Sequence, residues 1–390
     1  MTPLPFEYAF RNLARSRVRL ITSLVGATLV VLLALAAGGF IRGMNQTLMS
    51  DVPLHENVII LGAGSEEAIE RSQIDAGVEG AIAAGVRGLR AEGGQLFVSP
   101  EIHMALPVFR SDDDSRELQA VMRGVRPVAL LVHPQVEIIA GRFPQAGHDE
   151  LMVGELAATR LGVDDADLAI GRTLRFDHRD WTIVGRFAAP RTVMNAEVWI
   201  PLIDLQIATK REASLSCVIA SLDTATFSDL DILAKSRLDL EIVAMRESDY
   251  YKSLAEFYRP IRIMIVLTAS LIALGGLLGG LTTMYAAFAA RVREVGALQA
   301  IGFTRPAVVL SLVQESVFTA ACGAIMALVA GLALLDGVSI RISMGAFSLS
   351  LDPPVILAGL LAGLAVGLIG AIPPAIRCLK LPIPEALRAV

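Results

Sequence analysis

The stretch that decides the fold is residues 263–290, which read IMIVLTASLIALGGLLGGLTTMYAAFAA and contain no charged side chain. A helix needs about 20 mostly apolar residues to cross a bilayer, so this segment can span with some tilt. Residues 20–41, 306–335 and 354–376 meet the same test. We therefore expect an integral membrane protein with four transmembrane α-helices.

A large polar segment separates the first two apolar stretches. Hydrophobic residues make up 54% of the chain and the mean hydropathy is +0.59, yet residues 43–259 carry 33 acidic and 21 basic side chains, a net charge of −12. At roughly 215 residues this segment can bury its own core. Its mixture of short strands and helices predicts an α+β domain.

Ten basic residues flank the apolar stretches on the side that holds both termini. They are Arg11, Arg15, Arg17, Arg19, Arg291, Arg293, Arg305, Arg377, Lys380 and Arg388. The positive-inside rule places these residues, and both termini, in the cytoplasm. The large domain is then extracytoplasmic, and nucleic-acid binding is not expected because the basic residues lie next to membrane ends.

These observations divide the chain into successive segments. In the cytoplasm we expect an amphipathic lead-in that contacts membrane lipid over 1–19, a connection over 291–305 and a tail over 377–390. The spans are expected over 20–42, 260–290, 306–335 and 354–376. Outside the cytoplasm we expect the large domain over 43–259 and a short loop over 336–353.

Three local patterns in the polar segment predict its elements. Thr226 followed by Asp229 forms a capping box that starts a helix. Gly162 ends a short helix that begins at Glu155. Residues 173–176 and 181–187 alternate in hydrophobicity around a polar turn, which predicts a β-hairpin.

Small and polar residues inside the spans carry further information. Glycines four apart lie on one helix face and allow close helix packing, within a dimer or between subunits. The second span contains Gly275, Gly276, Gly279 and Gly280, and the fourth contains Gly359, Gly363 and Gly367. Gln314 and Glu315 lie inside the third span, where a carboxylate is costly. The favoured explanation is that Glu315 pairs with Arg291, Arg293 or a helix terminus, and the alternative is a proton or substrate role.

Catalytic and metal-binding patterns are absent from the sequence. No two of the five histidines have zinc-ligand spacing, and there is no nucleophile elbow. The three cysteines fall at different depths or compartments, so no disulfide framework is expected. No Gly-x-x-x-x-Gly-Lys-[Ser/Thr] motif occurs. We therefore expect no catalytic residues, no metal and no cofactor, and no enzyme activity of the chain itself.

Two segments resemble a known family. They are FRNLARSRVR over residues 10–19 and RVREVGALQAIGFTR over residues 291–305, the latter followed by Glu315. Both are similar to the FtsX/MacB-type permeases of ABC transporters, which include LolC-type and DevC-type subunits. Residues 141–143, 151–162, 182–185 and 382–388 look like the same family. The resemblance covers nearly the whole chain. It implies a porter-like, two-lobed external domain, with the second lobe inserted at about residues 80–124.

The resemblance also implies a mechanism. In such permeases the segment after the second span couples to a cytoplasmic ATPase; here its residues would be Arg291, Arg293, Glu294, Val295, Gly296, Leu298, Ile301, Gly302 and Arg305. Val295, Leu298 and Ile301 are expected on its apolar side. ATP hydrolysis would move the external domain and so export or extract a lipoprotein, lipid, peptide or drug. MacB itself has a fused ATPase, so the missing phosphate-binding motif implies a separate ATPase subunit that binds the ATP.

Several alternatives remain open at this stage. A membrane-anchored signalling or scaffold subunit, acting on an external partner such as a cell-wall hydrolase, is the second functional reading. The resemblance places the chain in the cell inner membrane, as a homodimer or with a related permease. A periplasmic adaptor and an outer-membrane channel are further candidate partners.

Overall fold

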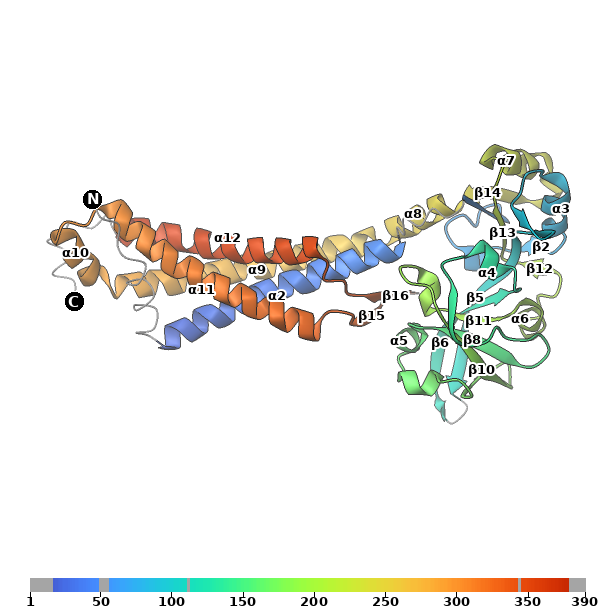
Figure 1. Ribbon diagram of the computed structural model, residues 1–390, viewed down its shortest axis with the longest axis horizontal. Coiled ribbons are helices and arrows are strands. Elements are labelled where there is room, and N and C mark those ends of the chain that lie inside the picture. Colours follow the sequence, from blue (N-terminus) through green and yellow to red (C-terminus); the bar gives the residue numbers. More distant parts are fainter. Residues whose placement is uncertain (1–16, 49–55, 111–112, 343–344, 379–390) are drawn as a thin grey trace. The chain divides into compact units, whose positions relative to one another are not determined.

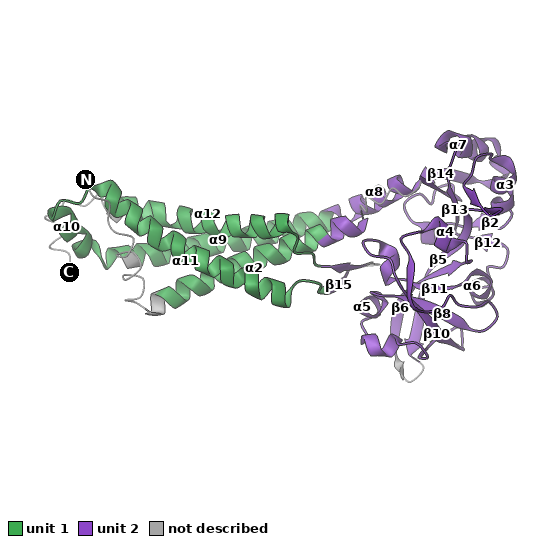
Figure 2. Ribbon diagram, in the orientation of Figure 1, with its two compact units in different colours: residues 1–42, 260–338, 349–390 green, residues 43–259, 339–348 purple. Residues whose placement is uncertain are grey.

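The computed structural model describes residues 17–48, 56–110, 113–342 and 345–378; the remaining residues are grey in Figure 1. The predicted amphipathic lead-in, apart from its last three residues, and all but the first two residues of the predicted tail lie outside this described part. The chain divides into two compact units (Figure 2). The helical unit comprises residues 1–42, 260–338 and 349–390, and the sheet domain comprises residues 43–259 and 339–348.

The helical unit contains four long helices, each long and apolar enough to cross a membrane. They are α2 (Arg17–Leu48), α9 (Arg259–Ala289), α11 (Arg305–Leu334) and α12 (Pro353–Cys378). A short helix, α10 (Val292–Ala300), connects α9 to α11. The four helices coincide with the four apolar stretches of the sequence, so the chain is a multi-pass membrane protein.

The sheet domain is built on one ten-stranded mixed sheet with the order β14-β1-β13-β5-β6-β11-β8-β10-β7, while β9 pairs with β10 and β5. Its strands are β1 (Asn57–Gly62), β5 (Val98–Arg110), β6 (Asp113–Val125), β7 (Glu137–Gly141), β8 (Glu150–Gly154), β9 (Thr173–Phe176), β10 (Arg179–Ala188), β11 (Val198–Pro201), β13 (Cys217–Ser221) and β14 (Ile242–Arg246). Three two-stranded pairs accompany it: β2 (Ile74–Asp75) with β12 (Ser214–Leu215), β3 (Ala91–Glu92) with β4 (Gln95–Leu96), and β15 (Ser339–Ile342) with β16 (Gly345–Ser348).

Helices cover both faces of this sheet. They are α3 (Val78–Gly85), α4 (Ala129–Val132), α5 (Ala157–Leu161), α6 (Leu202–Ala208), α7 (Phe227–Ser236) and α8 (Glu247–Phe257). Neighbours along a strand point to opposite faces, so Ile60 belongs to the core beneath α3 and α7, whereas Ile59 packs with Tyr250 of α8. Because both faces are covered, polar residues on the sheet can be buried as fully as apolar ones.

The long strand β5 connects two halves of the sheet. Its first residues, Val98 to Glu101, pair with β13, and the residues from Ile102 onward pair with β6. One half thus contains β14, β1 and β13 near α3 and α7, and the other contains β6, β8 and β10 near α5 (Figure 1). Residues 80–124, where an inserted lobe was expected, supply most of α3 and both strands of this central β5–β6 pair.

The local sequence signals have clear structural counterparts. The capping box of Thr226 and Asp229 starts α7, and Gly162 ends α5 in the left-handed conformation at φ 73°. The expected hairpin is β9–β10, and both residues of its turn, Asp177 and His178, have positive φ. Asn, Asp and His tolerate that conformation better than β-branched residues do. These three predictions are confirmed.

Candidate coupling site and buried charge network

Helix α10 buries one face against the ends of three long helices. Val292 and Val295 belong to an apolar cluster with Phe288 of α9, Leu312 of α11 and Ala375 of α12, and Leu298 is packed against that cluster. Gly296 is also buried. The apolar spacing of the sequence therefore fixes which side of α10 faces its own helical unit.

The opposite side of α10 is open. Arg293 and Glu294 are exposed within the helix, and Arg305 is exposed at the start of α11. Ile301 is 77% exposed, although its spacing predicted the apolar side. Ile301 caps α10 with helical φ and ψ, and its nitrogen donates a hydrogen bond to the Ala297 carbonyl oxygen at 3.0 Å, so its side chain still follows the helix. Each step of three residues falls roughly 60° short of a full turn, and three such steps turn Ile301 to the side opposite Val292. Gly302 follows at φ 109°, a conformation that suits glycine.

A buried ion pair fixes the start of α10 to the third long helix. Arg291 Nη1 donates a hydrogen bond to Glu315 Oε2 at 3.0 Å, and the two side chains are only 12% and 6% exposed. Glu315 therefore has the kind of partner that the sequence suggested for it. Gln314, its neighbour, is half-buried.

The glycines of α12 face neighbouring helices of the same chain. A Cβ on Gly359 would lie 2.6 Å from Leu35 Cδ2, and one on Gly363 would lie 2.5 Å from Val31 Cγ2. A Cβ on Gly367 would lie 2.4 Å from Ala320 Cβ. Ser316 also donates a hydrogen bond to the Gly367 carbonyl oxygen at 2.9 Å. These glycines let α12 approach α2 and α11 closely.

The glycines of α9 are placed differently. Only Gly276 meets a neighbour, since a Cβ there would lie 2.3 Å from Val30 Cγ2. No heavy atom of the described part of the chain would lie within 4 Å of a Cβ on Gly275, Gly279 or Gly280. Within the described chain, the small-residue face of α9 is thus turned away from the rest of the helical unit.

Comparison with known families accounts for most of the chain. Residues 20–244 match the MacB-like periplasmic core domain, and residues 266–383 match the FtsX-like permease C-terminal domain. The chain belongs to the FtsX/MacB permease family. The family is one of transporter permease subunits.

Two solved structures are similar to the sheet domain of this permease. The periplasmic region of MacB from Actinobacillus actinomycetemcomitans aligns over 54% of this chain and 97% of its own, with 10% identity and a TM-score of 0.39. The extracellular domain of the noncanonic ABC-type transporter YknZ from Gram-positive bacteria aligns over 48% and 99%, with 12% identity and a TM-score of 0.36. Comparison with curated proteins found no similar sequence.

Two of the family-like stretches of the permease meet where β7 approaches β10. A Cβ on Gly141 would lie 2.1 Å from the Val184 carbonyl oxygen, and one on Gly185 would lie 2.2 Å from the Arg142 carbonyl oxygen. Arg142 then donates two hydrogen bonds to the Glu150 carboxylate, at 2.5 and 2.7 Å. Glycine is needed at both positions for the strands to lie this close.

A network of charged residues is buried in the sheet domain, and sequence reasoning missed it. Arg123, 3% exposed, donates hydrogen bonds to Glu197 at 2.6 and 2.8 Å and to Glu101 at 2.7 Å. The nitrogen Nε2 of His103 and that of His133 each lie 3.0 Å from an oxygen of Glu101. Five groups that usually face water are therefore packed against one another.

Register explains how the strands bring these residues together. Glu101 and His103 lie two residues apart on β5 and share one face. Across the strands, Glu101 is opposite Cys217 of β13, and His103 is opposite Arg123 of β6. Glu101 therefore lies at the point where β5 passes from one half of the sheet to the other.

Charge pairing decides the ionisation of this network. Burial alone would raise the pKa of Glu101, but Arg123 and the hydrogen bonds from the two histidines hold that pKa well below its usual range. Burial likewise opposes the ionisation of Glu197, and Arg123 overcomes it, so the pKa of Glu197 is also lowered. Both carboxylates are therefore ionised inside the domain.

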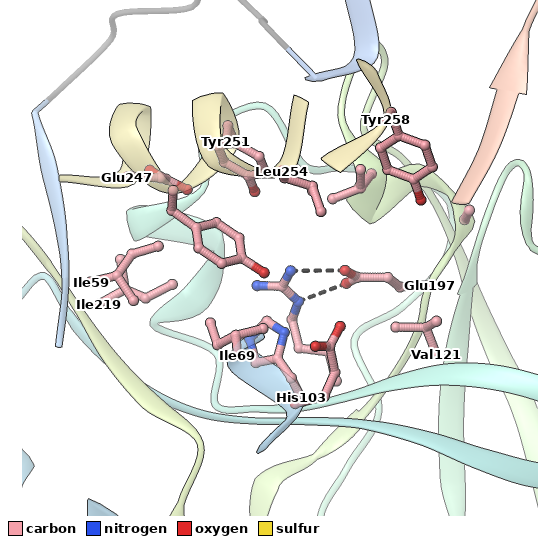
Figure 3. Close-up of a pocket in the computed structure, with 15 residues that line it drawn as sticks. Ile59, Ile69, His103, Val121, Glu197, Ile219, Glu247, Tyr251, Leu254 and Tyr258 are labelled. Carbon is pink, nitrogen blue, oxygen red and sulfur yellow. Dashed lines mark hydrogen bonds and ion pairs between the residues drawn. The ribbon is translucent and has the colours of Figure 1, made fainter. Parts of the chain in front are cut away.

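A cavity of about 70 Å³ lies over the network. Figure 3 shows Tyr251, Leu254 and Tyr258 on one side of it and His103 and Glu197 on the other. Glu247, at the start of α8, also lines the cavity and accepts a hydrogen bond from Asn57 at 2.8 Å. The sequence contains one signal of the buried network, because Ser99, Glu101 and His103 occupy alternate positions along β5. The same pattern is equally typical of a strand with one face in water.

Proposed function

We propose that this permease is the membrane subunit of an ABC transporter whose ATPase is a separate cytoplasmic protein, and that the ATPase binds α10. The two-sided character of α10 carries the proposal: Val292 and Val295 anchor it to three long helices, while Arg293, Glu294 and Ile301 face outward. Such a helix can enter a groove on a partner and pass its movement to the helices it packs on. ATP would be bound by that partner, because the chain lacks a phosphate-binding lysine motif.

The chain offers continuous paths from α10 to the sheet domain. Helix α9 follows α8 of the sheet domain after one intervening residue, Tyr258. Helices α11 and α12 are joined through the β15–β16 hairpin, which belongs to the sheet domain. In that hairpin, Phe347 packs against Tyr258 with ring centroids 5.4 Å apart. Movement of α10 would thus reach the sheet domain through both connections.

The same proposal includes location and assembly. The flanking arginines support an inner-membrane protein with both termini in the cytoplasm and the sheet domain outside. The outward glycines Gly275 and Gly279 of α9 support a homodimer through that face, with a related permease as the other candidate partner. The cargo would be a lipoprotein, lipid, peptide or drug that the external domain exports or extracts. A periplasmic adaptor and an outer-membrane channel are further candidate partners.

The test is affinity purification of the chain from its native membrane in mild detergent, with identification of the proteins that co-purify. An ABC-type ATPase at near-equal stoichiometry is the expected result. The matched control is the same purification with Ile301→Asp, which should lose the ATPase and retain the other partners. Recovery of a cell-wall hydrolase with no ATPase would overturn the proposal in favour of the signalling function.

A further inference from the structure

Three side chains of metal-ligand type converge where the two halves of the sheet meet, and a histidine adjoins them. Ligand atoms of Glu101, His103 and Cys217 all lie within 4.8 Å of one another. His133 Nε2 lies 3.0 Å from an oxygen of Glu101. All four residues are at most 5% exposed. The three ligands come from β5 and β13, so the spacing of histidines along the sequence could not reveal them.

Negative charge exceeds positive charge among the carboxylates and the guanidinium of this cluster. Two buried carboxylates, those of Glu101 and Glu197, share one guanidinium, that of Arg123. Burying charge without an equal counter-charge is costly, so a cation bound here would stabilise the folded domain.

His133 holds the Glu101 carboxylate from beside the cluster. Its Nε2 lies 3.0 Å from Glu101, its Nδ1 faces Glu247 at 3.9 Å, and Nδ1 has no hydrogen-bond partner in the described part of the chain. Carboxylates that bind a metal ion are commonly hydrogen-bonded by such neighbouring residues, which fix their orientation.

We propose that Glu101, His103 and Cys217 bind a divalent transition-metal ion, with His133 hydrogen-bonded to Glu101 from outside the ligand set. Thiolate, imidazole and carboxylate together are a donor set that suits Zn²⁺. Arg123 would stay hydrogen-bonded to Glu101 and orient its carboxylate from outside the site. The cavity beneath α8, which His103 and Glu247 line, offers a path for the ion (Figure 3).

Binding would couple to loss of the thiol proton. Burial, and then the negative charge of Glu101, raise the pKa of Cys217 well above its usual value, so the thiol is protonated without the ion. The ion would bind the thiolate and release that proton to solvent.

The test uses the full-length chain, purified in detergent without an affinity tag. Its metal content is measured first; the metal is then removed with a chelator and replaced by titration with Co²⁺, whose thiolate complex absorbs in the near ultraviolet. About one ion per chain and a cobalt–thiolate band are expected. Cys217→Ser should abolish the band and His133→Gln should weaken Co²⁺ binding by about 10- to 100-fold. The control Cys322→Ser, in α11, should leave both unchanged.

A second measurement does not depend on the folding of the variants. Zn²⁺ added to the metal-free wild-type chain should raise its Tm, because a ligand that binds only the folded state stabilises it. Mg²⁺ at the same concentration should not. Absence of both the cobalt–thiolate band and the Zn²⁺-dependent rise in Tm in the wild-type chain would overturn the proposal, as would a band of equal intensity in a folded Cys217→Ser variant.

Discussion

Arg291, the residue immediately before α10, donates a hydrogen bond to Glu315 at 3.0 Å across 24 residues of chain. Both side chains are nearly buried, so neither charge can be solvated well if the other is removed. The pair therefore fastens the start of α10 to the side of α11. An element that passes movement between two helices needs such a rigid attachment at one end.

The first prediction is a strong coupling between these two residues. Glu315→Ala and Arg291→Ala should each lower the free energy of unfolding by about 3 kcal/mol, since each leaves a buried charge without its partner. The double variant should lose much less than the sum of the two, because it leaves no charge unpaired. Unfolding in detergent by a graded denaturant measures all four proteins.

An exposed ion pair provides the control for this cycle. Arg259 and Glu256 lie 3.3 Å apart with side chains 65% and 66% exposed. Glu256→Ala should change the free energy of unfolding by less than about 0.5 kcal/mol. Simple additivity of the Arg291 and Glu315 variants would show that the pair contributes no coupling.

The second prediction separates partner binding from folding on α10. Ile301→Asp places a charge on a side chain that is 77% exposed, so the Tm should be unchanged while ATPase binding and stimulated ATP hydrolysis are lost. Val295→Asp places a charge at a position only 4% exposed. It should unfold the α10 region and lower the Tm strongly. Normal ATPase stimulation by a folded Ile301→Asp chain would count against the coupling role.

Local physics explains which parts of the fold could be predicted. The four spans follow from apolar length alone, and the start of α7 follows from the hydrogen bonds of Thr226 and Asp229. The buried side of α10 follows from helical spacing as far as Leu298. The prediction failed at Ile301 because steps of three residues drift by roughly 60° each around a helix, so three steps from Val292 reach the opposite side.

The buried network could not be predicted for a different reason. Glu101 and His103 alternate with Ile102 and Met104 on β5, the pattern of a strand with one side in water. Only the fold shows that α4 and α8, distant in sequence, cover that side. Whether a polar face is buried depends on long-range packing, and so does the approach of Cys217 to Glu101.

The third prediction contrasts two glycines of the spans. Gly367→Ala should destabilise the chain by about 1–3 kcal/mol, because its Cβ would lie 2.4 Å from Ala320 Cβ, which is attached directly to the backbone. A Cβ on Gly279 would have no heavy atom within 4 Å in the described chain. Because alanine favours the helix more than glycine does, Gly279→Ala should leave the free energy of unfolding unchanged or raise it by up to about 1 kcal/mol. Thermal unfolding of both variants in one detergent decides between them.

The fourth prediction concerns the proposed dimer face of α9. Gly279→Leu should leave the Tm unchanged but convert dimers into monomers, since a large side chain would hold the two small-residue faces apart. Mass photometry of the purified chain measures the change. A wild-type chain that is monomeric in several mild detergents would contradict the homodimer.

The last prediction is a pH dependence that arises at the β7–β10 junction. The hydrogen bonds from Arg142 outweigh the effect of burial and lower the pKa of Glu150. A lowered pKa in the folded state contributes stability that is complete above the ordinary glutamate value of about 4.3 and is lost as the pH falls through the folded value. Glu150→Gln should therefore lower the Tm by a few degrees at pH 7, and the difference from wild type should shrink steadily below about pH 5.

Glu137 provides the matched control for this experiment, because it is an exposed glutamate on the neighbouring strand β7. Glu137→Gln should follow the wild-type Tm at every pH. Glu150 also accepts a hydrogen bond from the Gln145 backbone nitrogen at 2.9 Å, so Glu150→Gln should increase protease cleavage between residues 141 and 150 at pH 7. A difference in Tm that stays constant from pH 7 to pH 3 would mean that the side chain acts through its shape and not through its charge.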